Sequence, residues 1–205
     1  MTATYIRDAT LVRPGSSIAQ GSLLLRDGRI AAVDPDSAQL PVDCEIIDAV
    51  GKLLTPGLID VHTHGIHGFP YERDAQDMIE GTALLAQYGT TCVLPTLYKI
   101  LDGDSLDKIE RLTAALDHVS GVYIPGFHFE GPFLAIPGAG ARTVPGDLGL
   151  LDELLSAANG RVSAMSISPE CPNILPIIER LHSRGIAIFI THTPLAQPMF
   201  RVSFA

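Results

Sequence analysis

Apolar and polar positions follow two different patterns, and the change between them lies near residue 55. Before this point, short β-prone runs alternate with turns. Asp27-Gly28, between the runs at residues 21–26 and 29–33, is a strong hairpin-turn signal. Residues 1–55 are therefore predicted to form a small all-β module, and residues 56–205 a second domain.

The second domain has alternating strand and helix patterns. Short apolar runs predict strands at residues 58–62, 91–96, 122–129, 162–167 and 186–190. Apolar positions at helical spacing predict helices at residues 74–88, 104–119, 148–158 and 174–184. Because the strand runs are almost continuously apolar, they are typical of a parallel sheet that is buried on both faces.

Repeated β-α units form either an open doubly wound sheet or a closed barrel. No G-x-G-x-x-G motif follows the first of these strands, which disfavours a dinucleotide-binding sheet. Polar residues with catalytic potential follow the strands, where a barrel has its active site. About five units are present, whereas a complete barrel has eight. The predicted fold is therefore α/β, with a partial (β/α)8 TIM-like barrel.

Composition narrows the class of protein. The chain has 205 residues, 46% hydrophobic and 18% charged, with a net charge of −9, as expected for a globular protein. Basic residues occur singly, so no nucleic-acid partner is expected. No signal peptide and no apolar run of ~18 residues is present, so no membrane partner is expected. The 3 cysteines lack C-x-x-C spacing, which favours reduced thiols and a cytoplasmic location.

The strongest chemical motif is His62-Thr63-His64, directly after the first strand of the second domain. Side chains alternate in an extended segment, so the two imidazoles point the same way and can bind one ion. Two polar loop residues are the ordinary alternative, but the position at a strand end favours a metal site. Asp60 precedes them and has either a supporting or a purely structural role.

Two further strand ends carry potential ligands. His128 and Glu130 alternate onto one face, and a carboxylate at a strand end can complete or bridge a metal site. His192 follows the last apolar strand. Each residue alone has a structural explanation, but their matching positions favour Glu130 and His192 as ligands beside His62 and His64.

These motifs resemble a known family. The segments P-G-L-I-D-V-H-T-H-G, H-F-E-G-P and T-H-T follow the pattern of the amidohydrolase superfamily, and within it they most resemble N-acetylglucosamine-6-phosphate deacetylases. Gly89-Thr90-Thr91 and Ser168-Pro169-Glu170 also match. The resemblance extends to about Thr193.

The resemblance implies a metal-dependent hydrolase that removes the acetyl group of an N-acetyl amino-sugar phosphate. Glu130 and His192 would hold one divalent ion, and His62 with His64 a second ion in two-metal members. Zinc is the preferred ion, while iron, manganese and cobalt suit the same ligands. The first module would be the small β-sandwich of such enzymes.

The chain departs from the family in three places. Gly140-Ala141-Arg142 has an arginine where the family has a sugar-contacting histidine, so Ala141 and Arg142 are the expected substrate-binding residues. The family's catalytic Asp lies beyond the last residue, which leaves the catalytic residue unknown. Residues 194–205 lack the helical period of the family. We therefore expect a truncated chain, stabilised as a homo-oligomer.

Two alternatives remain open at this point. The chain is either an enzyme or a truncated, inactive relative that only binds metal or oligomerises. A cyclic-amide hydrolase of the dihydroorotase type also uses H-x-H, but commonly adds a carbamylated lysine as the bridging ligand. Because Glu130 suits the bridge, the sequence favours the deacetylase.

Overall fold

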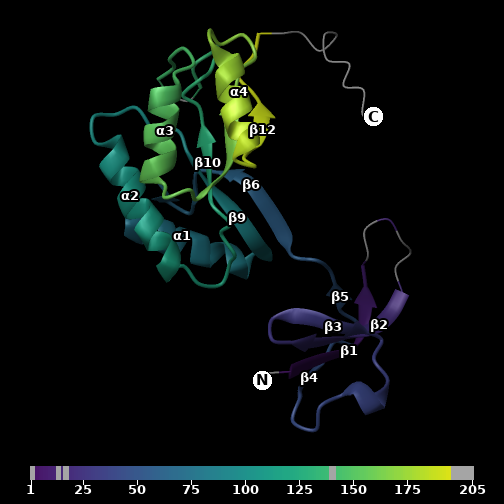
Figure 1. Cartoon of the computed structure of the whole chain (residues 1–205). Helices are drawn as coiled ribbons and strands as arrows, with labels where there is room; N and C mark the ends of the chain where they lie inside the picture. The colour runs from purple at the N-terminus through teal and green to yellow at the C-terminus, as the bar shows by residue number, and fades with distance from the viewer. Residues whose placement is uncertain (1–2, 13–14, 16–18, 139–141, 195–205) are drawn as a thin grey trace. The chain divides into compact units, whose positions relative to one another are not determined.

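The fold is described from a computed structural model of the chain, for residues 3–12, 15, 19–138 and 142–194. The chain divides into two compact units, Met1–Gly57 and Leu58–Ala205. Both units are drawn in Figure 1. In the described residues, no helix is both long and apolar enough to cross a membrane.

The first unit is a mixed β-sheet. Its strands are β1 (Ala3–Leu11), β2 (Ala19–Arg26), β3 (Arg29–Val33), β4 (Glu45–Asp48) and β5 (Leu53–Leu54). The order is β3-β2-β1-β4, and β5 also pairs with β1. Asp27 and Gly28 have φ of 51° and 74° and join the antiparallel pair β2–β3, which confirms the predicted hairpin.

Two details of this unit differ from the sequence pattern. The two short runs predicted around residues 5–7 and 10–12 belong to one strand, β1, whose register shifts between Ile6 and Ala9. Asp8, with φ of 58°, lies at this shift. The described residues form one sheet, so they supply a single layer of the expected sandwich. Its small core contains Ala9, Leu11 and Ala49.

The second unit is built on a parallel sheet in the order β12-β11-β10-β9-β6. Its strands are β6 (Leu58–Thr63), β9 (Thr90–Leu97), β10 (Phe127–Glu130), β11 (Val162–Ile167) and β12 (Ala187–Ile190). A short hairpin, β7 (Gly65–Ile66) and β8 (Phe69–Pro70), follows β6. The pattern did not reveal this hairpin, because two-residue strands carry no periodicity.

Four predicted helices connect the strands. They are α1 (Ala75–Gln87), α2 (Ser105–Ala115), α3 (Leu148–Ala157) and α4 (Ile174–Ser183), with a 3-10 turn η2 (Leu116–His118) after α2. Asp74 caps α1 by accepting from Asp77 N. Successive helices contact one another along one face of the sheet (Figure 1).

The sheet curls as part of a barrel, which confirms the predicted fold class. Its centre is densely apolar: Phe127, Phe129, Met165 and Leu154 are all completely buried. The edge strands differ, because β6 and β12 each have only one neighbouring strand in the described sheet. Ile59 on β6 is 69% exposed and Ile190 on β12 is 52% exposed.

Candidate metal centre

The parallel sheet brings the predicted ligands to one edge. His62 lies near the carboxyl end of β6, His64 directly after it, and Glu130 at the end of β10. His192 follows β12 by two residues. Parallel strands present their carboxyl ends at the same edge, so residues that are distant in the chain lie close together there.

Glu130 lies at the centre of the group. Its Oε2 lies 3.1 Å from His64 Nε2 and 3.8 Å from His62 Nε2. Its Oε1 lies 2.8 Å from His192 Nε2. The side chain of Glu130 is only 12% exposed. All four predicted ligands are therefore adjacent.

The donor set suits a divalent cation. Ligand atoms of His62, His64 and Glu130 all lie within 4.8 Å of one another. Imidazole nitrogens and a carboxylate are ligands for zinc and for other first-row metals.

The backbone orients the imidazole of His64. His64 Nδ1 lies 3.1 Å from the carbonyl oxygen of Thr96. A carbonyl oxygen only accepts, so Nδ1 donates in this contact, and the ring then directs Nε2 toward the carboxylate of Glu130. This is the usual way in which an outer partner fixes a metal-binding histidine.

His192 is held through its own carbonyl group. It has φ of 51°, which an ordinary residue rarely adopts. Its carbonyl oxygen accepts from Ile136 N at 3.1 Å and from Ser168 Oγ at 3.0 Å. Ser168 belongs to the Ser168-Pro169-Glu170 motif, and its hydroxyl also donates to the carbonyl oxygen of Thr191 at 2.8 Å.

His128 does not join the group, although it shares a strand face with Glu130. It is completely buried, with Nδ1 2.8 Å from Val61 O and Nε2 2.9 Å from Ser166 Oγ. Burial lowers the pKa of His128, and both ring nitrogens already have partners. Its position one layer deeper in the sheet, not its face, excludes it as a ligand.

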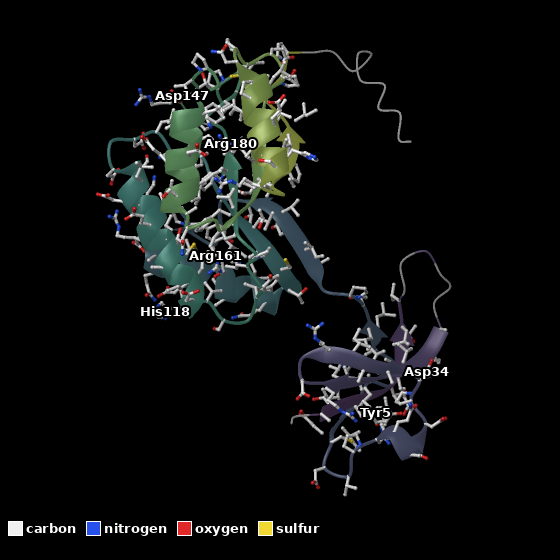
Figure 2. The ribbon with its side chains drawn as sticks, viewed as in Figure 1. Tyr5, Asp34, His118, Asp147, Arg161 and Arg180 are labelled. Carbon is white, nitrogen blue, oxygen red and sulfur yellow. The ribbon has the colours of Figure 1, made fainter. Side chains whose placement is uncertain are left out.

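The other candidate residues have structural contacts. Asp60 Oδ1 accepts from His62 N at 3.1 Å, within the part of β6 where the register with β9 shifts. His67 Nε2 contacts Tyr88 Oη at 2.9 Å. His118 and His182 are exposed, and His118 is labelled in Figure 2.

The expected substrate residues are only partly visible. Ala141 lies outside the described residues. Arg142 is exposed, and its Nη1 donates to Leu101 O at 3.1 Å. The structure does not bring Arg142 into the group of predicted ligands.

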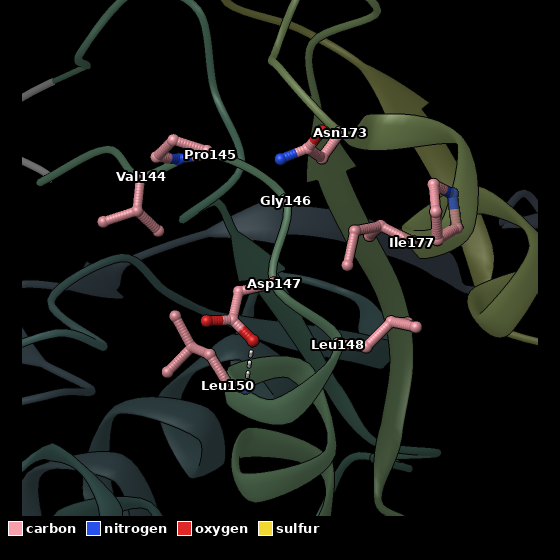
Figure 3. Close-up of a pocket in the computed structure, with 9 residues that line it drawn as sticks. Val144, Pro145, Gly146, Asp147, Leu148, Leu150, Asn173 and Ile177 are labelled. Atoms are coloured by element: carbon pink, nitrogen blue, oxygen red, sulfur yellow. Dashed lines mark hydrogen bonds between the residues drawn. The ribbon is translucent and has the colours of Figure 1, made fainter.

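A separate pocket of about 640 Å³ lies at the start of α3 (Figure 3). It is lined by Val144, Pro145, Gly146, Asp147, Leu148, Leu150, Asn173, Pro176 and Ile177. Its carboxylate, Asp147, accepts from Gly149 N at 2.8 Å and therefore caps α3. None of the predicted ligands lines this pocket, so the chemistry lies elsewhere.

Gly138 provides a test of how tightly His192 is held. A Cβ at this position would lie 2.1 Å from Cε1 of His192. Gly138→Ala should therefore displace the imidazole from Glu130 and lower the free energy of unfolding by about 1–3 kcal/mol, as overpacking does. Urea unfolding and the ¹H–¹⁵N signals of the His192 ring measure the two effects.

Gly103→Ala is the matched control, because nothing lies within 4 Å of its added Cβ. Its stability should change by less than about 0.5 kcal/mol. Unchanged His192 signals in Gly138→Ala would show that the ring is not confined as described.

No protein-family model matches the chain. It is 27% identical over 201 residues to the N-acetylglucosamine-6-phosphate deacetylase of Bacillus subtilis (strain 168), covering 92% of this chain and 50% of that protein. It is 26% identical over 197 residues to the N-acetylgalactosamine-6-phosphate deacetylase of Escherichia coli O157:H7, covering 89% and 48%. The chain thus spans about half the length of the curated relatives it matches.

Solved structures share the fold. The crystal structure of N-acetylglucosamine-6-phosphate deacetylase from Pasteurella multocida matches with a TM-score of 0.77 and 21% identity, over 94% of this chain and 52% of that one. The resemblance drawn from the strand-end motifs is confirmed: the chain is a relative of the N-acetylglucosamine-6-phosphate deacetylases.

Proposed function

We propose that this chain carries the metal centre of a deacetylase that hydrolyses the acetamido group of an N-acetyl amino-sugar phosphate. The observation that supports this most directly is the convergence of His62, His64 and His192 on Glu130. The relatives are named as deacetylases of N-acetylglucosamine-6-phosphate or N-acetylgalactosamine-6-phosphate. They favour neither a cyclic-amide hydrolase nor an inactive fragment.

In this proposal, His62, His64, Glu130 and His192 hold one or two divalent ions, with zinc preferred. A bound ion of this kind polarises the acetyl carbonyl and lowers the pKa of a water molecule to about 7. The protein supplies the orientation. Thr96 O keeps His64 Nε2 directed at Glu130, and Ser168 Oγ with Ile136 N fixes the backbone of His192.

The low exposure of Glu130 also matters in this proposal. Charge interactions are stronger where water is excluded, so a carboxylate that is 12% exposed binds a cation more firmly than a surface carboxylate. We also propose a cytoplasmic location, which the free cysteines Cys44, Cys92 and Cys171 support.

Metal content and acetate release test the proposed function. The purified chain should bind zinc at one or two ions per chain and release acetate from N-acetylglucosamine-6-phosphate, with loss of activity on chelation. Glu130→Gln and His192→Ala should lower zinc affinity by more than the roughly 10–100-fold that outer partners contribute. Elemental analysis measures the number of zinc ions per chain, and calorimetry measures the zinc affinity of each variant.

His182→Ala is the control, since His182 is exposed on α4. It should bind zinc as the unchanged chain does. Equal zinc binding by all variants would refute the metal site. Zinc binding without acetate release from any N-acetyl amino-sugar phosphate would support the inactive-relative alternative.

Arg142 is proposed to bind the substrate phosphate. Its guanidinium has five N–H donors, and Nη1 already donates to Leu101 O. A hydrogen bond to a charged group contributes about 1.5–3 kcal/mol, or roughly 10–100-fold in affinity. Arg142→Ala should weaken binding of N-acetylglucosamine-6-phosphate by this factor and leave N-acetylglucosamine unaffected, as measured by calorimetry. Arg184→Ala, at the exposed end of α4, should change neither.

Self-association is proposed to cover the exposed edge of the sheet. Leu58 and Ile59 on β6 are 62% and 69% exposed, and an open strand edge with apolar side chains invites pairing. Light scattering should therefore give a multiple of 21.9 kDa. Ile59→Lys should reduce the mass to that of one chain, whereas Leu175→Lys, which is 70% exposed on α4, should not. A monomer at all concentrations would contradict the proposal.

A further inference from the structure

Glu72 is a partly buried carboxylate next to the metal centre that the motifs did not identify. It follows the hairpin β7–β8, which reverses the chain so that Tyr71 N donates to His64 O at 2.9 Å. The hairpin depends on Gly65: a Cβ there would lie 2.3 Å from Phe69 O, and its φ is 151°. The residues after the hairpin are therefore returned to the end of β6.

The carboxylate of Glu72 binds the end of the next strand. Its Oε1 accepts from both Tyr98 N and Lys99 N at 2.9 Å. Because β9 ends at Leu97, these are the first two N–H groups after the strand. β6 ends at Thr63 and does not pair with them, so Glu72 takes the place of a strand neighbour.

Placing the carboxylate of Glu72 at this partly buried position costs free energy. Burial raises the pKa of Glu72, while the N–H groups of Lys99 and Tyr98 and the charge of Lys108 oppose this rise. Its Oε2 is also buried, without a hydrogen-bond partner among the described residues. A buried polar atom without a partner costs free energy and calls for an explanation.

The segment that Glu72 binds is the one that orients His64. Thr96 O accepts from His64 Nδ1 at 3.1 Å, and the Tyr98 ring meets the His64 ring edge to face, with centroids 5.0 Å apart. Thr96 and Tyr98 lie on either side of Leu97. A displacement of the Tyr98 backbone would therefore shift both contacts of the imidazole.

We propose that Glu72 is a positioning residue for His64: by binding Tyr98 N and Lys99 N, it holds the end of β9 where Thr96 O and the Tyr98 ring direct His64 Nε2 at Glu130. The proposal rests on the proposed function in one respect, namely that His64 is a metal ligand. It predicts two separable consequences, one in the metal-free chain and one in metal binding.

The first consequence is the tautomer of His64. In the metal-free chain, the ¹H–¹⁵N spectrum should show His64 protonated at Nδ1. Glu72→Ala should give a mixture of tautomers, because Thr96 O is no longer fixed against the ring. Glu72→Gln retains an acceptor oxygen and should keep the Nδ1 tautomer. Glu80→Ala, which removes an exposed glutamate of α1, should have no effect.

The second consequence is the affinity for Co²⁺, read from its visible absorption. Glu72→Ala should weaken Co²⁺ binding by roughly 10–100-fold, as changes in outer partners of ligands do. Glu72→Gln and Glu80→Ala should retain the affinity of the unchanged chain. If the alanine variant does not fold, Glu72→Met replaces it, because methionine keeps the length of the side chain but has no acceptor oxygen. Glu72→Met should also give mixed His64 tautomers and weaker Co²⁺ binding.

The outcomes separate the two proposals. Glu72→Ala and Glu72→Met lack the acceptor oxygen. If such a variant is less stable but keeps both the His64 tautomer and the Co²⁺ affinity, the positioning role of Glu72 is wrong. If the unchanged chain binds no Co²⁺, the proposed function fails. The tautomer then still decides whether Glu72 holds His64.

Discussion

Parallel strand pairing is the constraint on which the site depends. In the sheet β12-β11-β10-β9-β6, every strand runs in the same direction, so every strand ends at the same edge. Glu130 at the end of β10 therefore meets His64 after β6 and His192 after β12. Phe127 and Phe129 on β10 are completely buried in the centre of this sheet.

Backbone groups orient the candidate ligands at this edge of the sheet. Thr96 O binds the imidazole of His64, and Ile136 N binds the carbonyl of His192. Backbone groups have fixed positions once the ladder has formed, so they orient side chains without a further loss of conformational freedom. Glu72 extends the same principle, since its carboxylate binds N–H groups that the ladder leaves unpaired beyond β9.

The edge strands of the sheet are more exposed to solvent than its central strands. β9, β10 and β11 are buried by neighbours on both sides, whereas the apolar side chains of β6 remain exposed. Leu58 and Ile59 are apolar because such strands are normally covered. The described sheet thus has a well-packed centre, while apolar side chains of both edge strands, such as Ile59 and Ile190, are exposed.

The order of strands and helices, and the four candidate ligands, could be predicted from the sequence alone. These follow from local periods and from motifs at strand ends, such as His62-Thr63-His64 and Glu130. Which strand-end residues reach the edge of the sheet depends on packing: His128 shares a face with Glu130 but lies deeper, against Val61 and Ser166. Gly138 and Glu72 were likewise not predictable from the sequence. Their roles depend on contacts with residues distant in the chain, and such contacts leave no period or spacing in the sequence.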